Sequence, residues 1–372
     1  MSMYNKRIFC LFFVFAFLTI NSIYAGKATK NKTETNTVWT KEKAINWYAT
    51  LPWLSGCNFQ PSSAINQLEM WQADTFDANT IDKELGWAEE LGFTTMRVYL
   101  SSVVWNNDAL GLKKRMNQFL EISSKHNIRP LFVFFDDCWN PESYYGKQPD
   151  PKSGVHNSGW VQDPSVSLRN DTIKLYPVIE RYVKDILTTF KNDKRILMWD
   201  LYNEPGNSNH GITSLPLLKN VFKWAREVNP SQPVTSGIWY FGCNELNVFQ
   251  VENSDIITYH NYSGVKEHQA EINYLKMFNR PMICTEYMAR KHDSKFESIM
   301  PLLKSENVGA INWGFVSGKT NTIFAWDEPM PNVKEPKLWF HDIYRQDHTP
   351  FDQNEIDSIR NINGEGKSKI GF

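Results

Sequence analysis

The stretch that decides the fold is RILMWDLYNEP, residues 195–205. Its first part is mostly apolar and has the composition of a buried strand. Pro205 ends this strand, because proline lacks the backbone donor that a sheet requires and has a fixed φ. Glu204 is therefore predicted to lie directly after the carboxyl end of a buried strand.

The same pattern of a short apolar run, a loop and a longer amphipathic segment repeats along the chain. Strands that are apolar on both faces and alternate with helices are typical of parallel sheets. The eight predicted strands are 53–59, 94–100, 130–135, 196–202, 234–238, 256–260, 282–285 and 309–314. The predicted helices are 41–50, 81–91, 113–126, 173–190, 215–228, 245–249, 265–278 and 296–306, with a last helix or pair after Pro336.

These units predict an α/β protein with a single (β/α)₈ TIM barrel. Long loops are expected after the third strand, at 136–170, and after the eighth, at 315–335. The alternative fold is an open doubly wound sheet, which would have a glycine-rich turn after its first strand. The segment at that position is CNFQPSS, residues 57–63, and contains no glycine. We therefore favour the closed barrel, which carries its catalytic groups at the carboxyl ends of the strands.

Residues 1–25 have the pattern of a secretory signal peptide. Lys6 and Arg7 precede an apolar run, and small residues near Ala25 offer a cleavage site. The run of about 13 residues is shorter than the span of about 20 residues that a membrane helix needs, so an uncleaved anchor is the less favoured alternative. We expect a secreted or periplasmic protein with a flexible leader at 26–40 and one catalytic domain at 41–372.

The charge balance and the cysteine and histidine content limit which partners, cross-links and metals we expect. Removing residues 1–25 takes away two basic residues and leaves 38 basic against 41 acidic residues, a net charge of −3. Such a balance gives no basic surface for nucleic acid or an anionic membrane. We expect a monomer whose four remaining cysteines are free and mostly buried. The eight histidines show no His-Glu-x-x-His spacing, so neither a catalytic metal nor a cofactor is predicted.

Only two of the predicted strands end in a glutamate. These are Glu204 on the fourth strand and Glu286 on the seventh. Two carboxyl groups about 5–5.5 Å apart are what a retaining glycosidase needs, one as acid and base and the other as nucleophile. Asn203 can bond a sugar 2-hydroxyl, which favours Glu204 as the acid and base. Glu286 would stay ionised through donors from Arg97 and Tyr262.

Together these residues resemble glycoside hydrolase family 5 and its relatives in the same clan. The shared elements are Asn-Glu-Pro on strand four, an Arg on strand two, His-x-Tyr on strand six, a Glu on strand seven and a Trp on strand eight. Members of the family are retaining β-glycosidases on (β/α)₈ barrels, including cellulases, mannanases and xylanases. The resemblance implies Glu204 as acid and base, Glu286 as nucleophile, Asn203 as 2-hydroxyl contact, Arg97, His260 and Tyr262 as supporting residues, and Trp313 as the platform under the sugar.

The chain also departs from the family pattern. The family often has a histidine near the end of strand three, where this chain has Asp136 and Asp137 after the apolar run. These aspartates could bind Ca²⁺ or hold sugar hydroxyls. Trp139, Trp160 and Trp326 lie in the two long loops, where they could bind sugar or pack the loops themselves.

The expected function is that of an exported retaining glycoside hydrolase that cleaves β-glycosidic bonds by double displacement, with a carbohydrate of the β-mannan or β-glucan type as substrate. Two alternatives stay open. A transglycosylase would use the same two glutamates, and a glycan-binding barrel would have lost one of them. Endo or exo action depends on whether the two long loops leave the mouth of the barrel open or close one side of it.

Overall fold

A computed structural model describes residues 37–364 of the chain. The predicted signal peptide and most of the predicted leader lie outside the described residues. Of the leader, residues 37–40 are described, and Trp39 is buried with its backbone N–H donating to Asp255 at 2.8 Å. The side chain of Thr40 caps the first helix by accepting a hydrogen bond from the Lys43 N–H.

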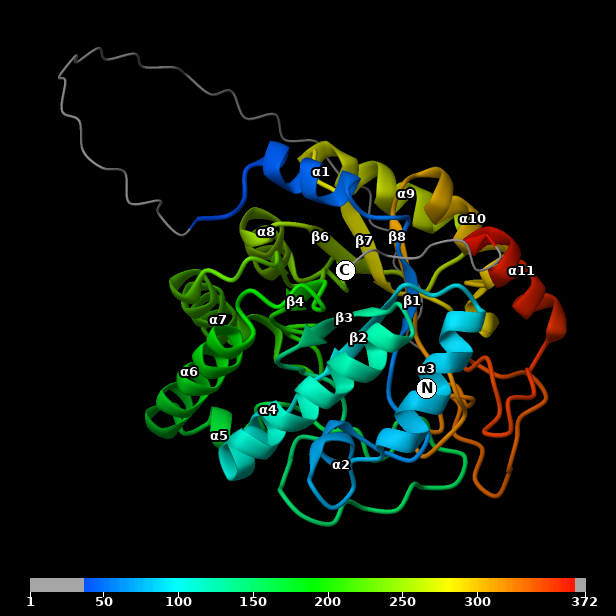
Figure 1. Ribbon diagram of the computed structural model, residues 1–372, viewed down its shortest axis with the longest axis horizontal. Coiled ribbons are helices and arrows are strands. Elements are labelled where there is room, and N and C mark those ends of the chain that lie inside the picture. Colours follow the sequence, from blue (N-terminus) through cyan, green and yellow to red (C-terminus); the bar gives the residue numbers. More distant parts are fainter. Residues whose placement is uncertain (1–36, 365–372) are drawn as a thin grey trace. The chain divides into compact units, whose positions relative to one another are not determined.

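Eight parallel strands form the core of the fold (Figure 1), and the predicted (β/α)₈ barrel is confirmed. The ladder runs β5-β4-β3-β2-β1-β8-β7-β6. Its ends meet where Ile238, just after β5, exchanges backbone hydrogen bonds of 3.0 and 2.8 Å with Thr258 and His260 of β6. The strands are β1 Ser55–Asn58, β2 Thr95–Tyr99, β3 Arg129–Val133, β4 Met198–Asp200, β5 Val234–Thr235, β6 Ile257–His260, β7 Met282–Glu286 and β8 Gly309–Asn312.

Helices connect the strands and surround them (Figure 1). They are α1 Lys41–Ala49, α2 Gln67–Trp71, α3 Ala78–Glu90, α4 Ser102–Lys125, α5 Val166–Arg169, α6 Thr172–Thr189, α7 Leu215–Val228, α8 Asn244–Asn253, α9 Val265–Leu275, α10 Phe296–Ser305 and α11 Gln353–Asn363, with 3-10 turns at Gly211–Ser214, Lys276–Phe278 and Arg290–His292. The part of the chain that the structure describes contains no helix that is both long and apolar enough to cross a bilayer.

The main differences from the predicted elements have local causes. Helix α4 begins at Ser102 instead of residue 113, because Ser101 caps it and the helix continues through a kink at Asp108. The short α2 was missed; Asn66 caps it by accepting from the Glu69 N–H. A single helix, α11, follows Pro336 and begins only at Gln353, so the irregular segment after β8 is longer than predicted.

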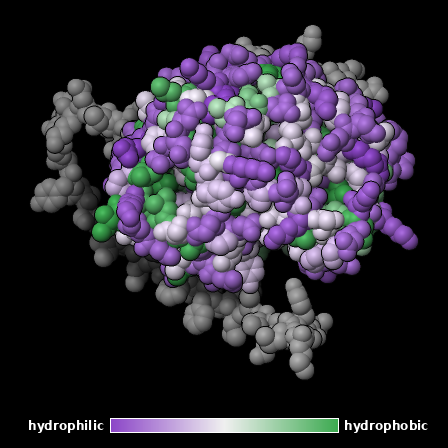
Figure 2. Space-filling view, turned by 90° about the horizontal axis from the view of Figure 1, so that it is seen from below, coloured by the Kyte–Doolittle hydropathy of each residue, from purple (hydrophilic) through white to green (hydrophobic). Residues whose placement is uncertain are grey.

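The two ends of the barrel have different roles. Helix α1 lies over the amino ends of the strands, at the top of Figure 1, and its Ala44 and Tyr48 pack on the apolar interior. That interior layer consists of Leu54, Leu131, Leu197, Met198, Ile256, Ile283 and Ile311. Helix α2 and the loops after the strands lie at the opposite, carboxyl end. Figure 2 looks onto this end, where hydrophilic residues dominate and hydrophobic patches lie toward the edges.

The four cysteines in the described residues are free, as predicted. Cys57, Cys138 and Cys284 are buried and Cys243 is partly exposed. The hydrophobic core around the barrel therefore holds the fold without a covalent cross-link in this part of the chain.

A matched pair of leucine substitutions tests the importance of the interior layer. Leu131 is fully buried in that layer, whereas Leu110 on α4 is 72% exposed. Leu131→Ala is expected to lower the free energy of unfolding by about 2–5 kcal/mol, because it leaves a cavity inside the barrel. Leu110→Ala should change it by less than about 0.5 kcal/mol. Urea unfolding followed by circular dichroism measures both, and equal effects would contradict this assignment of the core.

Candidate active site

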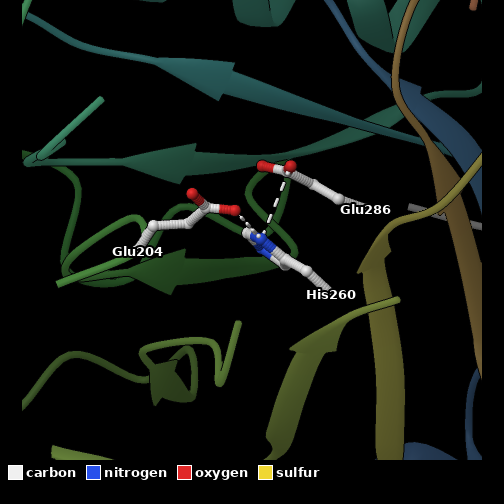
Figure 3. Close-up of side chains that lie close together, drawn as sticks. All are labelled: Glu204, His260 and Glu286. Carbon is white, nitrogen blue, oxygen red and sulfur yellow. Dashed lines mark hydrogen bonds and ion pairs between the residues drawn. The ribbon is translucent and has the colours of Figure 1, made fainter. Parts of the chain in front are cut away.

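Glu204 and Glu286 meet at the mouth of the barrel, on either side of His260 (Figure 3). Glu286 is the last residue of β7, and Glu204 lies four residues beyond β4. One oxygen of each carboxylate and a ring nitrogen of His260 all lie within 4.8 Å of one another. The His260 Nδ1 atom is 2.7 Å from Glu204 Oε1 and 3.4 Å from Glu286 Oε2. The structure therefore brings together the two glutamates that the sequence singled out.

A buried arginine organises the floor of the site. Arg97 of β2 has no exposed surface, and its Nη1 atom donates to Glu286 Oε1 at 2.8 Å. Its Nε and Nη2 atoms both donate to Asp200 Oδ2, at 3.0 and 2.7 Å. The remaining acceptors are Asn203 Oδ1 at 2.7 Å, Asn58 Oδ1 at 2.9 Å and the Tyr99 hydroxyl at 2.6 Å. One guanidinium thus fixes side chains from β1, β2, β4 and β7.

Glu286 receives three donors, which stabilise its ionised form. Besides Arg97, the hydroxyl of Tyr99 donates to Oε1 at 3.1 Å and that of Tyr262 to Oε2 at 2.7 Å. Burial raises the pKa of Glu286 above its ordinary value, against the lowering effects of His260, Arg97 and Tyr262. Glu204 adds to the rise, because its negative charge repels a second one nearby.

Glu204 lies in a less charged environment and in an unusual backbone conformation. Its φ is +44°, in the left-handed region that non-glycine residues rarely occupy and that is concentrated at functional sites. Burial raises the pKa of this carboxyl, and hydrogen bonds from Cys138 and Asn207 oppose the rise. Burial also lowers the pKa of His260 to about 4, so its imidazole is neutral near pH 7.

Asn203 is held tightly in the floor of the site. Its Oδ1 accepts from Arg97, and its Nδ2 donates to Asp136 Oδ1 at 2.9 Å. These two contacts fix the orientation of the amide. Asn203 is thus oriented by the residues that also support the two glutamates.

Asp136 and Asp137 are buried below the site and bind protein donors. Asp136 accepts from Asn203, from the Cys138 N–H at 2.9 Å and from the Trp160 Nε1–H at 2.7 Å. The oxygens of Asp137 accept from the Arg169 guanidinium, the Tyr202 and Ser214 hydroxyls and the Gly206 N–H. Asp137 therefore holds the turn that carries Glu204, and both aspartates act as supports for neighbouring residues.

Trp313 and Trp160 lie next to each other on the β2 side of the site. Trp313 is partly buried, and its ring lies edge-on at 6.0 Å from Tyr99 and 5.9 Å from Trp160. Trp160 is only 2% exposed. It packs against Tyr99 with its rings 5.0 Å apart. Trp313 keeps a surface that a sugar ring could use, whereas Trp160 supports Tyr99 and Asp136 from within the loop.

Trp139 and Trp326 belong to a second aromatic group near Tyr262. Trp326 lies edge-on to Tyr262 at 5.0 Å, and His156 lies 6.1 Å from Trp326 and 5.5 Å from Trp139. Trp139 is 41% exposed. The loops after β3 and β8 therefore both contribute rings to an aromatic group that contacts Tyr262, a donor to Glu286.

Sequence reasoning missed several residues of the site. Asp200, Tyr99 and Asn58 are the last residues of their strands, a position that could have marked them as site residues. Polar residues are also common where a strand passes into a loop, so the position alone did not distinguish them. Cys138 had no such signal. Its Sγ lies 3.2 Å from Glu204 Oε2, and the thiol donates to that carboxylate.

Glu204, His260 and Glu286 are also of the types that bind metal ions. Arg97 places a positive charge against Glu286, which opposes a second cation there. The absence of a catalytic metal stays a prediction.

Replacing the thiol tests its influence on Glu204. Cys138→Ala removes a donor to the carboxylate, so the pKa of Glu204 is expected to rise further above its ordinary value. Titration of [¹³C]glutamate-labelled protein by NMR measures this, with Glu204→Gln to assign the signal. Cys138→Ser keeps a donor and serves as the matched control. A fall in the pKa of Glu204 in Cys138→Ala would contradict the contact.

Solved structures share this fold at low sequence identity. A β-mannanase from the blue mussel Mytilus edulis superposes with a TM-score of 0.53 at 16% identity, over 86% of this chain and 95% of that one. An endo-1,4-β-mannanase from Rhizomucor miehei gives 0.51 at 14% identity, over 83% and 95% of the two chains. GH5_18 from Streptomyces cattleya, in complex with GlcNAc, gives 0.57 at 12% identity, over 84% and 80%.

These likenesses show a common barrel, so the fold expected from the resemblance to the family 5 clan is confirmed. Comparison with curated protein sequences finds no match. The family profile described as "Glycosyl hydrolases family 2, TIM barrel domain" matches residues 153–360, more than half of the chain. The protein is a glycoside hydrolase on a TIM barrel, and it belongs to the family of glycosyl hydrolase family 2 TIM barrel domains.

Proposed function

We propose that the protein is a retaining β-glycosidase with Glu286 as nucleophile and Glu204 as general acid and base. The observation that carries the proposal is the short separation of the two carboxylates, with oxygens within 4.8 Å of each other. Retaining enzymes have their carboxyl groups about 5–5.5 Å apart, whereas inverting enzymes need about 6.5–9.5 Å for a water molecule. The separation supports retention of configuration.

In the first step, a Glu286 oxygen attacks the anomeric carbon while Glu204 gives its proton to the departing glycosidic oxygen. A glycosyl-enzyme ester forms at Glu286 and the leaving sugar departs. In the second step, Glu204 takes a proton from water, which attacks the same carbon and releases Glu286 as a carboxylate. Two inversions give net retention.

The surroundings of each glutamate suit these roles. Arg97 and two hydroxyls donate to Glu286 and favour its ionised form. The donors to Glu204 are instead Cys138 and Asn207, with Arg97 acting on it only as a weaker charge, and its carboxyl is buried beside a neutral His260. Once Glu286 is esterified its negative charge is gone, so the pKa of Glu204 falls and the group can act as base.

For the substrate, we propose a β-linked carbohydrate of the β-mannan or β-glucan type, with mannosides as the first choice. Support comes from the structural neighbours, which are β-mannanases and a GH5_18 enzyme in complex with Manb1-4GlcNAc. We further propose an exported protein, on the grounds of the signal pattern at residues 1–25, and no nucleic-acid partner, on the grounds of the net charge. A monomer without a cofactor stays our expectation. Transglycosylation remains the alternative that uses the same two residues.

Removing each carboxylate separates the two roles. Glu286→Ala is expected to lower kcat on an aryl β-mannoside by at least about 10⁴-fold, because no glycosyl-enzyme can form. Added azide should restore turnover and give the α-glycosyl azide. Glu204→Ala should instead give the β-glycosyl azide, since Glu286 still reacts first. NMR of the products distinguishes the anomers, and circular dichroism checks the fold. Full activity of Glu286→Ala would end the assignment.

The pH profile of kcat/KM should have both limbs above the ordinary carboxyl range. Glu286 must be ionised, so its raised pKa places the acid limb above 4.5, its ordinary value. Glu204 must be protonated, so its raised pKa sets the basic limb. With an aryl substrate that needs no proton, Glu204→Ala should lose the basic limb and keep the acid one. An acid limb at or below pH 4.5 in the wild type would contradict this environment.

A further inference from the structure

The two sides of the mouth can be assigned if the proposed function holds, on which this inference rests. Glu286 attacks the sugar that keeps the anomeric carbon, so that sugar lies beside Tyr99 of β2 and Trp313, which follows β8. Glu204 protonates the leaving oxygen, so the leaving chain extends past β4 and β5. Trp239, after β5, donates its indole N–H to the Pro205 carbonyl at 3.0 Å and thus lies on the leaving side.

The two long loops join each other on the side of the sugar that is attacked. The Asn157 N–H donates to the Thr320 carbonyl at 2.8 Å, and the Met330 N–H to the Gly154 carbonyl at 2.9 Å. His156 Nδ1 bonds the Phe324 carbonyl at 2.8 Å. Residues of the loop after β3 therefore pair with residues of the loop after β8 through their backbones.

The segment after β1 completes this wall, which we define as residues 136–165, 315–335 and 60–72. Asn66 Nδ2 donates to the Gly159 carbonyl at 2.9 Å, and Gln67 Nε2 to the Val161 carbonyl at 2.7 Å. On the other flank, the Lys319 N–H donates to the Ser62 carbonyl at 3.1 Å. The wall is thus continuous from the end of β8, past β1 and β2, to the end of β3.

A glycine permits the closest approach within the wall. Gly154 has φ of +68°, and a methyl group there would overlap the carbonyl of Met330. Gly146 in the same loop has φ of +111°, but a methyl group there would have nothing within 4 Å. The seam between the two loops therefore depends on Gly154, and Gly146 is its matched counterpart.

A small cavity lies where the wall meets Trp313 at the end of the barrel. It offers solvent about 20 Å³. A water molecule needs roughly 10–15 Å³ by the same measure, so the space fits water and excludes a further sugar. Its lining includes Asn58, Gln60, Tyr99, Trp160, Trp313 and Thr320. This cavity therefore has room for water but none for a second sugar.

Exposed aromatic rings lie on the leaving side. The turn after β5 exposes Tyr240 and Phe241, with 58% and 50% of their surfaces accessible. The ring of Tyr240 lies 5.5 Å from that of Trp239. Flat exposed rings beside the departing oxygen can stack on the sugars of a leaving chain.

We propose that the enzyme acts from the chain end and releases one sugar at a time from the non-reducing terminus. The wall closes the mouth behind that single sugar, and the aromatic residues after β5 support the remaining chain as it leaves. Endo cleavage would need at least a second sugar on the walled side.

Two versions of one substrate test this proposal. β-1,4-Mannopentaose labelled at its reducing end is supplied either free or with a 4,6-O-benzylidene acetal on its non-reducing terminal sugar. Exo action should shorten the free chain to a labelled tetrasaccharide plus mannose. The blocked chain should be hydrolysed at least about 100-fold more slowly. Mass spectrometry of the products at early times measures the hydrolysis of both chains. Equal cleavage of the two, or labelled di- and trisaccharides as first products, would overturn the inference. Inactivity on both chains and on aryl β-mannoside would instead count against the proposed function.

A glycine pair tests whether the wall is the cause. Gly154→Ala should force the seam open, so hydrolysis of the blocked chain is expected to rise at least about tenfold. Gly146→Ala should leave the blocked chain as resistant as in the wild type. Thermal unfolding confirms that both variants fold. A folded Gly154→Ala that treats the two chains as the wild type does would overturn the wall as the determinant.

Discussion

The site depends on the buried guanidinium of Arg97. Removing a positive charge from water costs several kcal/mol, and here Asp200 and Glu286 offset that cost by direct ion pairs. Because the planar group donates in several fixed directions, it also sets the relative positions of β1, β2, β4 and β7 at their carboxyl ends. The charged groups in the floor of the mouth therefore depend on one another. Loss of Arg97 would leave the carboxylates of Asp200 and Glu286 buried without a positive charge beside them.

The loops build on this floor in two ways. Some of their side chains stabilise the turn that carries Glu204, as Asp137 does through its four protein donors. Others place aromatic rings around Glu286, as Trp160 does through Tyr99 and Trp326 through Tyr262. The chemistry thus lies at the strand ends, where positions are rigid, and the access of substrate is set by segments that only have to pair with each other.

The sequence predicted the barrel and the meeting of Glu204 and Glu286 because both follow from local patterns. Apolar runs report buried strands, and a glutamate just after such a run must lie at the mouth. Asp136 and Asp137 could not be placed in this way, since the direction of a side chain after a strand depends on what later segments provide. Trp160 supplied the donor to Asp136, and Arg169 and Gly206 those to Asp137. The contact between Cys138 and Glu204 joins two irregular turns. Hydrophobic periodicity predicts helices and strands, so it could not predict this contact.

The barrel closes between β5 and β6, and this is the shortest of its strand pairings. Strand β5 has two residues, and a bridge from Ile238 to Tyr259 connects the two edges of the sheet. The Thr235 hydroxyl adds contacts of 2.8 Å to the Ile256 carbonyl and to the Thr258 hydroxyl, and the Asp255 N–H donates to the Val234 carbonyl at 2.9 Å. Glu204 and His260 stand on opposite sides of this closure and bond each other across it. A sugar that binds both would hold the two edges together. If carbohydrate binds here as proposed, it would stabilise the contact between β5 and β6. Amide hydrogen exchange at Ile238 and His260 would then slow when the site is occupied.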